Sequence, residues 1–282
     1  MKTVTTQTIR NKKKNNEIIT MLTAYDYPTA AILDEAGIDI ILVGDSLGMV
    51  ILGYENTTEV TIEDMLHHVK AVSRGSKHSL IVADLPFLTY HTGKYEAVRN
   101  AGRLVQEGKA NAVKLEGGTE VIKQTKAIIN AGIPVMGHIG LTPQSINQLG
   151  GYYIQGKSEE KAKKLLEDAM ALEEAGAFAI VLECIPTELA KLITEKVEIP
   201  TIGIGAGSDC DGQVLVTNDI LNLYSNMVPK FVKQYANLQD EIMKAASNYI
   251  RDVKQKAFPN KEHVFHIKQD VIDSIYGGGK KS

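Results

Sequence analysis

The chain has 282 residues, of which 44% are hydrophobic and 23% are charged, and its formal net charge is −3. This balance is typical of a globular protein with enough apolar residues for a core. The slight acidic excess argues against a nucleic-acid binder, which normally carries a basic face. With only Cys184 and Cys210 present, we expect no disulfide framework, as is usual in the cytoplasm.

The amino-terminal residues predict no export or membrane signal. They contain no apolar stretch of the kind that a signal peptide needs. No apolar run in the chain approaches the ~20 residues of a membrane span. Lys12, Lys13 and Lys14 are more typical of a solvated surface segment than of a polyanion site. We therefore expect a cytoplasmic protein without a membrane partner.

Apolar runs in chain order predict eight strands. Several runs follow a helix that ends near glycine, where a left-handed residue commonly caps the last turn; the glycines are Gly37, Gly108, Gly132 and Gly176. The runs are continuous rather than alternating, as in parallel strands buried on both faces. The expected strands lie near residues 18–24, 38–44, 79–84, 111–116, 134–138, 178–183, 200–204 and 213–216.

The helices between the strands have recognisable starts. Thr61 and Asp64 form a capping box ahead of one helix. Ser158 precedes another helix, whose expected buried face is Ala162, Leu165, Leu166, Ala169, Met170 and Leu172. Alternating strands and helices favour a closed (β/α)8 TIM barrel over a doubly wound open sheet. We expect a single catalytic barrel domain over residues 1–260 and a C-terminal extension over 261–282, with a mobile end.

Polar residues that could carry chemistry stand where five predicted strands end. In (β/α)8 barrels the active site lies at that end of the strands. A single acidic residue there often caps the next helix, but capping explains five successive strands less well. The residues are Asp45, Asp84, Glu116, His138 and Glu183.

Three of these carboxylates are candidate metal ligands. Hard oxygen donors suit Mg²⁺ or Mn²⁺ rather than zinc, so we expect Asp45, Asp84 and Glu116 to bind the ion directly or through water. Lys114 lies two residues before Glu116 and faces the same side of its strand. It could balance the negative charge or hold an anion, or could belong only to a structural salt-bridge network.

Other residues near the strand ends carry weaker signals. His138 could hydrogen-bond a substrate oxygen or could orient a carboxylate. The glycine loop at residues 203–207 lacks the GxGxxG spacing of a dinucleotide site. Cys184 is expected to be an inert core thiol on the strand face opposite Glu183.

Six segments in order closely resemble the ketopantoate hydroxymethyltransferase family. The resemblance covers roughly residues 3–260, and the residues beyond match little. Asn218 departs from the family pattern, which commonly has histidine at this position. Residues 59–64 match the usual sequence of the family less closely. The segments are VGDSLG at 43–48, ADLPF at 83–87, VKLEGG at 113–118, GHIGLTPQS at 137–145, VLEC at 181–184 and IGIGAG at 202–207.

The resemblance implies transfer of a hydroxymethyl group from 5,10-methylenetetrahydrofolate to 3-methyl-2-oxobutanoate, giving 2-dehydropantoate in pantothenate biosynthesis. It also implies Mg²⁺, which would stabilise an enolate of the 2-oxo acid, and a homodecamer. By the same resemblance Glu183 is the proton acceptor. Metal binding falls on Asp45, Asp84 and Glu116, and substrate contacts fall on Asp45, Ser46, Asp84 and Lys114, to which the strand-end position of His138 adds a further candidate.

Two alternative functions use the same fold. The first is another Mg²⁺-dependent 2-oxo-acid aldolase or lyase of the isocitrate lyase and phosphoenolpyruvate mutase type, which would not depend on folate. The second is a non-catalytic barrel that binds a ligand. The complete set of charged strand-end residues argues against the second alternative.

Overall fold

The computed structural model describes residues 2–223 and 228–277. Eight parallel strands close into a barrel in chain order, and the last strand pairs with the first. This closure confirms the (β/α)8 barrel and all eight predicted strands, and it excludes the open sheet. The strands are β1 (Ile19–Thr23), β2 (Ile40–Val43), β3 (Leu80–Asp84), β4 (Ala112–Glu116), β5 (Val135–Gly140), β6 (Ala179–Glu183), β7 (Thr201–Ile204) and β8 (Gly212–Leu215).

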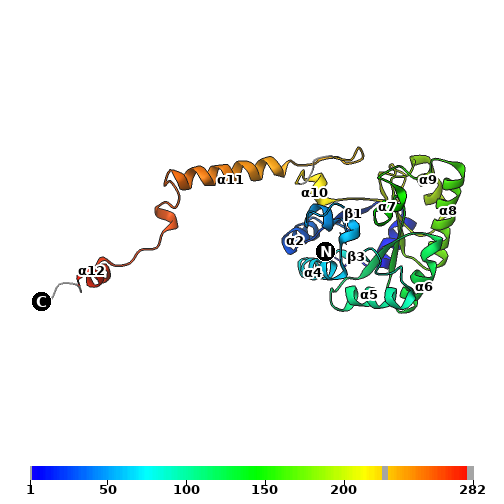
Figure 1. The fold of residues 1–282 in the computed structure, drawn as a ribbon, viewed down its shortest axis with the longest axis horizontal. Helices are drawn as coiled ribbons and strands as arrows, with labels where there is room; N and C mark the ends of the chain where they lie inside the picture. Colours follow the sequence, from blue (N-terminus) through cyan, green and yellow to red (C-terminus); the bar gives the residue numbers. More distant parts are fainter. Residues whose placement is uncertain (1, 224–227, 278–282) are drawn as a thin grey trace. The chain divides into compact units, whose positions relative to one another are not determined.

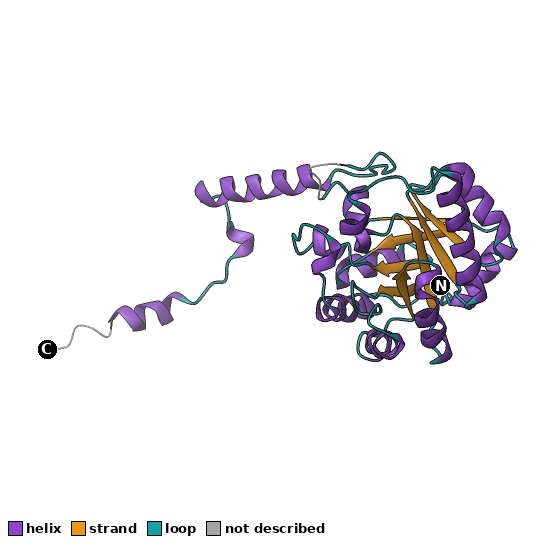
Figure 2. Cartoon of the chain, turned by 45° about the vertical axis from the view of Figure 1, so that its right-hand side comes forward, coloured by secondary structure: helices purple, strands orange, loops and turns teal. Residues whose placement is uncertain are grey.

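Helices surround the strands, as Figure 2 shows in purple and orange. Those labelled around the barrel in Figure 1 follow the chain from α2 to α9. The helices are α1 (Thr6–Lys14), α2 (Tyr27–Glu35), α3 (Leu47–Val50), α4 (Ile62–Gly75), α5 (Lys94–Gln106), α6 (Ile122–Asn130), α7 (Ile146–Leu149), α8 (Glu159–Glu174), α9 (Thr187–Lys196), α10 (Thr217–Ile220), α11 (Leu238–Lys254) and α12 (Gln269–Gly277). Of these helices, none is long and apolar enough to cross a membrane.

The interior of the barrel is apolar below its carboxyl-terminal mouth. Alternate residues of each strand face one side, and those of one parity form a single buried cluster. The same parity, continued to the strand ends, reaches the charged residues Asp84, Lys114, His138 and Glu183. The charged side chains therefore lie at the carboxyl-terminal end of the barrel interior, next to the apolar cluster. The cluster includes Ile19, Met21, Ile40, Leu42, Leu80, Val82, Ala112, Met136, Ala179, Val181, Ile202 and Val214.

The predicted helix starts are confirmed. Thr61 and Asp64 exchange backbone-to-side-chain hydrogen bonds at the start of α4, and Ser158 caps α8. The expected buried face of α8 is wrong at Met170, which is 52% exposed. Asp168 is buried on that helix instead, because it accepts a hydrogen bond from the backbone of Thr119 at 2.7 Å.

Three of the four predicted glycine caps have left-handed backbone: Gly37, Gly132 and Gly176. The prediction is wrong at Gly108, because the left-handed residue is Lys109, with φ 67°. Glycine is required at 108 for a different reason: a Cβ there would lie 2.5 Å from the carbonyl oxygen of Leu104.

Lys12 and Lys13 are partly buried, so the prediction of a solvated segment is wrong for these two lysines. Lys14 is exposed, as predicted. Ile9 of α1 is fully buried with the interior cluster, which orients this helix. Lys12 then pairs with Asp39 at 2.6 Å. Lys13 pairs with Asp211 at 3.0 Å and donates hydrogen bonds to two backbone carbonyls. These long-range partners explain why Lys12 and Lys13 are held against the protein.

The chain divides into two compact units, Met1–Tyr235 and Ala236–Ser282. The first unit holds the barrel strands, and the second holds α11 and α12. The expected domain boundary at residue 260 stays a prediction. The residues after 277, where a mobile end was expected, lie outside the described residues.

Candidate active site

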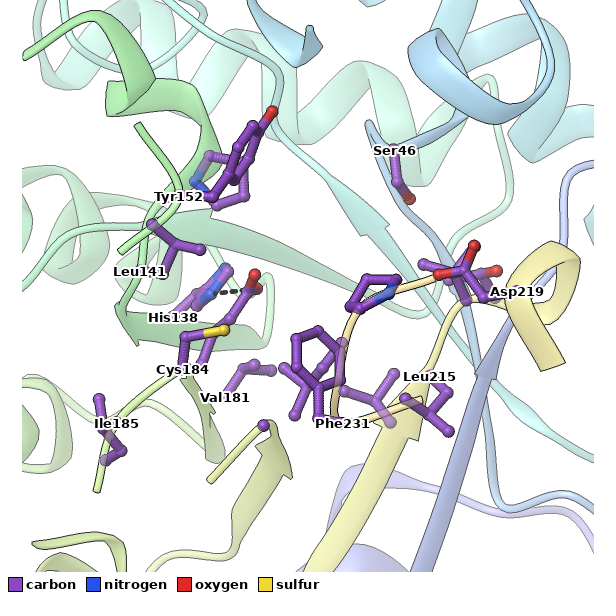
Figure 3. A pocket seen from close by; sticks show the side chains of 18 of the residues that line it. Ser46, His138, Leu141, Tyr152, Val181, Cys184, Ile185, Leu215, Asp219 and Phe231 are labelled. Atoms are coloured by element: carbon purple, nitrogen blue, oxygen red, sulfur yellow. Dashed lines mark ion pairs between the residues drawn. The ribbon is translucent and has the colours of Figure 1, made fainter. Parts of the chain in front are cut away.

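A cavity of about 1000 Å³ opens at the carboxyl ends of the strands, and Figure 3 shows it from close by. All seven residues that the sequence suggested for the site line this cavity. The structure therefore brings together side chains from β2 to β6 and the loops that follow them. The seven are Asp45, Ser46, Asp84, Lys114, Glu116, His138 and Glu183.

Lys114 is the central cation of the site. The strand register places Asp84 of β3 beside Lys114 of β4, and Lys114 Nζ lies 3.1 Å from Asp84 Oδ1. The same Nζ lies 3.2 Å from His138 Nδ1 on the next strand. Burial alone would lower the pKa of Lys114, but the charges of Asp84, Glu116 and Asp45 raise it above its ordinary value. Lys114 is therefore charged at neutral pH.

His138 connects two carboxylates. Its Nδ1 lies 3.5 Å from Glu116 Oε1, its partner across β4 and β5. Its Nε2 lies 3.1 Å from Glu183 Oε2, the contact dashed in Figure 3. The Nε2 atom makes no well-aligned hydrogen bond, so the contact is an ion pair. Burial and Lys114 lower the pKa of His138, but Glu116 and Glu183 outweigh them and raise it to about 9.

The two aspartates at this mouth are held close together. The backbone N–H of Asp45 donates to Asp84 Oδ2 at 3.1 Å. Burial and the charges of Asp84 and Glu116 raise the pKa of Asp45 well above its ordinary value. Burial also raises the pKa of Asp84, although Lys114 opposes it. Two nearby carboxylates with raised pKa values mark a place where a cation would be stabilised.

A buried amide that the sequence analysis missed connects the carboxylates. Gln144 Nε2 donates to Asp45 Oδ2 at 2.8 Å and to the carbonyl of Leu85 at 3.0 Å. The Gln144 backbone N–H donates to Glu116 Oε2 at 3.0 Å, and the Tyr90 hydroxyl donates to Gln144 Oε1 at 2.8 Å. Because Leu85 offers only an acceptor, this network fixes which end of the amide faces Asp45.

No sequence signal identified Gln144, because its partners come from three separate strand ends. It lies in the quoted segment after β5, within the short 3₁₀ turn Pro143–Ser145. A polar residue directly after Thr142-Pro143 reads as an ordinary turn residue.

Ser46 is also positioned by a residue from another strand end. Its hydroxyl lies 2.8 Å from the hydroxyl of Tyr25, which follows β1. Burial raises the pKa of Tyr25 above its ordinary value, so this tyrosine remains a neutral hydrogen-bond partner. Ser46 is thereby directed along one side of the cavity.

The expected position of Cys184, in the core on the strand face opposite Glu183, is wrong. It lines the cavity together with Glu183, because its left-handed backbone, with φ 48°, breaks the alternation of strand faces. Burial raises the pKa of this thiol to about 12, aided by the charge of Glu183. Cys184 is therefore a neutral thiol inside the cavity.

The residues of the cavity fit a divalent cation of the magnesium type. Asp84 Oδ1 is buried and accepts no hydrogen bond, although the Lys114 ammonium lies nearby. Within the described residues, no three His, Cys, Asp or Glu side chains are grouped closely enough to hold a metal by themselves. Mg²⁺ commonly takes only one or two carboxylates and completes its shell with water and substrate oxygens.

Solved structures with the same fold have distant sequences. The chain matches a structure of oxaloacetate acetylhydrolase with a TM-score of 0.60 at 13% identity, covering 98% of this chain and 99% of that one. It matches 2,3-dimethylmalate lyase, described as a phosphoenolpyruvate mutase/isocitrate lyase superfamily member, with a TM-score of 0.56 at 14% identity; the match covers 97% of this chain and 99% of the other. At this identity the likeness concerns the fold.

Sequence relatives are much nearer. A protein of Clostridium novyi (strain NT) named 3-methyl-2-oxobutanoate hydroxymethyltransferase is 60% identical over 272 residues, which are 96% of this chain and 99% of the relative. A protein of the same name from Enterococcus faecalis (strain ATCC 700802 / V583) is 59% identical over the same shares of both chains. The model of one protein family matches residues 3–261. The chain belongs to the ketopantoate hydroxymethyltransferase family.

Proposed function

We propose that this protein transfers a hydroxymethyl group from 5,10-methylenetetrahydrofolate to 3-methyl-2-oxobutanoate and releases 2-dehydropantoate for pantothenate biosynthesis. The name of its relatives gives the acceptor and the transferred group. The observation that carries the proposal is the buried cluster in which Lys114 and His138 stand among Asp84, Glu116 and Glu183. Such a cluster can hold a small anionic acid and move a proton beside it.

Glu183 is the proposed base that removes the proton from C3 of the acid. Its side chain is 16% exposed, whereas those of Glu116 and His138 are 4% exposed. Glu183 can therefore reach substrate in the cavity and can exchange its proton with solvent. His138 contacts Glu183, which favours the orienting role among the two considered for this histidine.

Lys114 is the proposed anion holder. Its charge, stabilised by three carboxylates, can bind the substrate carboxylate and compensate the oxygen charge that grows as the proton leaves. Asp45, Asp84 and Glu116 would hold Mg²⁺, directly or through water, and the ion when bound would supply Lewis-acid chemistry for the two oxygens of the 2-oxo acid. The carbanionic C3 would then attack the donor methylene carbon. Both bonds of that carbon to the folate nitrogens would break, so that tetrahydrofolate leaves and water provides the product hydroxyl.

Exchange of C3 deuterium provides the test. The enzyme with Mg²⁺ should release deuterium from labelled 3-methyl-2-oxobutanoate to solvent, and adding 5,10-methylenetetrahydrofolate should convert the acid to 2-dehydropantoate. Exchange without folate-dependent product would instead favour a folate-independent lyase or aldolase, the function class of the structural neighbour 2,3-dimethylmalate lyase. Neither exchange nor product would contradict both enzymatic functions.

We also propose a cytoplasmic location and a homo-oligomeric assembly. Both cysteines are free, which agrees with a reducing cytoplasm. A homo-oligomer, a decamer by family resemblance, is proposed as the working assembly.

A further inference from the structure

One carboxylate of the cavity has no role in the chemistry proposed above. Asp219 of α10 lines the cavity and follows β8, on the side of the barrel where β8 meets β1. Figure 3 shows it across the cavity from His138 and on the same side as Ser46. It therefore faces a region of the cavity away from the proposed base.

Asp219 differs from the other carboxylates of the cavity in having no side-chain partner among the described residues. Asp45, Glu116 and Glu183 each meet a hydrogen-bond donor or a cation, and so does Asp84. In the part of the chain that the structure describes, the Asp219 carboxylate makes no hydrogen bond or ion pair. Burial alone raises its pKa. A half-buried carboxylate without a donor is costly, and a ligand that brings donors would offset that cost.

The position of Asp219 is fixed before any ligand binds. Thr217, two residues earlier, donates its backbone N–H to Thr23 Oγ1 at 3.0 Å and its hydroxyl to the carbonyl of Thr23 at 2.5 Å. These bonds attach α10 to the end of β1. The carboxylate is thus presented by a rigid element, as a recognition group should be.

The cavity around Asp219 has more room than a small branched acid needs. Its volume of about 1000 Å³ lies at the upper end of the ~300–1,000 Å³ range of pockets that take drug-sized ligands. Much of the lining beyond the charged cluster is apolar, including Leu215, Val216, Tyr152 and Phe231. Tyr152 and Phe231 are 54% and 38% exposed, so each leaves ring surface free for a flat ligand.

We infer that Asp219 binds the pterin ring of the one-carbon donor, through the adjacent N3–H and 2-amino groups of that ring. Two neighbouring donors match the two oxygens of a carboxylate, and the flat ring would lie against the apolar lining. Lys157 and Lys230 also line the cavity and offer positive charge for the carboxylates of the donor's glutamate tail. This assignment rests on the proposed function, because it presumes a folate donor.

The test distinguishes binding of the folate donor from binding of the 2-oxo acid acceptor. Asp219→Asn keeps the shape of the side chain but replaces one carboxylate oxygen with an NH2 group. That group donates hydrogen bonds and would face the N–H groups of the pterin, which also donate. We expect the KM for 5,10-methylenetetrahydrofolate and the Kd of tetrahydrofolate by calorimetry to rise about 10- to 100-fold. Deuterium exchange from 3-methyl-2-oxobutanoate without donor should stay within about two-fold of the parent rate. Asp209→Asn, the same change at an exposed residue, should alter neither quantity.

A ligand analogue sharpens the comparison. The parent enzyme should bind tetrahydrofolate more tightly than its 2-deamino analogue, whereas Asp219→Asn should discriminate less between the two. Parent-like folate binding in Asp219→Asn would overturn the inference, and so would an equal loss of donor-free exchange, which would place Asp219 at the acceptor. If the parent enzyme exchanges deuterium but does not bind tetrahydrofolate, the proposal of a folate donor is wrong. That result differs from parent-like folate binding in Asp219→Asn, which contradicts only the role of Asp219.

Discussion

At the scale of single residues, Glu183 and Lys114 contribute to different steps. Glu183→Gln keeps the shape and hydrogen-bonding capacity of the side chain but removes the base. We expect deuterium exchange from C3 to fall by ~100- to 10,000-fold, with little change in the Kd of 3-methyl-2-oxobutanoate by calorimetry. Lys114→Ala is the comparison, because loss of the cation should weaken acid binding as well as turnover. Exchange at the parent rate in Glu183→Gln would make His138 the next candidate base.

Asp84 tests the metal assignment. Its Oδ1 is buried, lies 3.1 Å from Lys114 Nζ and accepts no aligned hydrogen bond, so a lone pair of this oxygen is available to a metal ion. A chelator should abolish activity and added Mg²⁺ should restore it, whereas Asp84→Ala should stay inactive at the Mg²⁺ concentration that saturates the parent. Calorimetric titration with Mg²⁺ in the presence of the 2-oxo acid provides the second readout. Full activity of the metal-free enzyme would refute the assignment.

At the scale of elements, the turn after β5 holds the carboxylates together. Gln144→Leu would leave Asp45 Oδ2 and the Leu85 carbonyl without the Gln144 donor, at a cost of ~1–3 kcal/mol for each buried group left unsatisfied. The Tyr90 hydroxyl would keep the Glu116 carbonyl as its acceptor. We expect a lower melting temperature and weaker Mg²⁺ binding. Gln148→Leu, an exposed glutamine four residues later, is the control. Parent-like Mg²⁺ binding in Gln144→Leu would show that the amide does not position Asp45.

Asp34 connects α2 to the segment before β3. It accepts hydrogen bonds from the backbone of His78 and Ser79 at 2.9 and 2.7 Å and from the Ser76 hydroxyl at 2.9 Å. Burial raises the pKa of Asp34, but the hydrogen bonds together outweigh burial and hold the pKa below its ordinary value. A lowered folded-state pKa means that the stabilisation is complete above the unfolded-state value of ~3.9 and is lost as pH falls below it.

Asp34→Asn should therefore lower the free energy of unfolding most at neutral pH. The gap between the variant and the parent should narrow as the pH falls below ~4, since protonation removes the advantage of the parent. Urea unfolding at several pH values measures this. Glu35→Gln, an exposed neighbour on the same helix, should show no such dependence, and a gap that stays constant with pH would contradict the role given to Asp34.

At the scale of the whole molecule, assembly is the property to measure. The expectation of a homo-oligomer rests on family membership. Light scattering should report a mass several times the 30.8 kDa of one chain, and dilution to micromolar concentration should not produce monomers. A monomer at that concentration would refute the oligomer and leave the barrel and its site unaffected.

Patterns in the sequence were enough to predict the barrel and most of the charged residues at its mouth. Local patterns were sufficient because apolar runs, glycine caps and a capping box depend on residues that are close in the chain. The period of two along a strand also predicted that Lys114 and Glu116 face the same side. Glu183, Asp84 and His138 could be found because each stands where a predicted strand ends.

Which side chains are in contact could be known only from the folded barrel. Closure of the barrel and the strand register brought Asp84 to Lys114 and Glu116 to His138, and the β5 turn brought Gln144 to three strand ends. Neither the partial burial of Lys13 nor the lack, among the described residues, of a partner for the Asp219 carboxylate has a local signature. The physical reason is that these contacts join residues far apart in sequence, so their energies depend on the packed barrel and not on neighbouring residues in the chain.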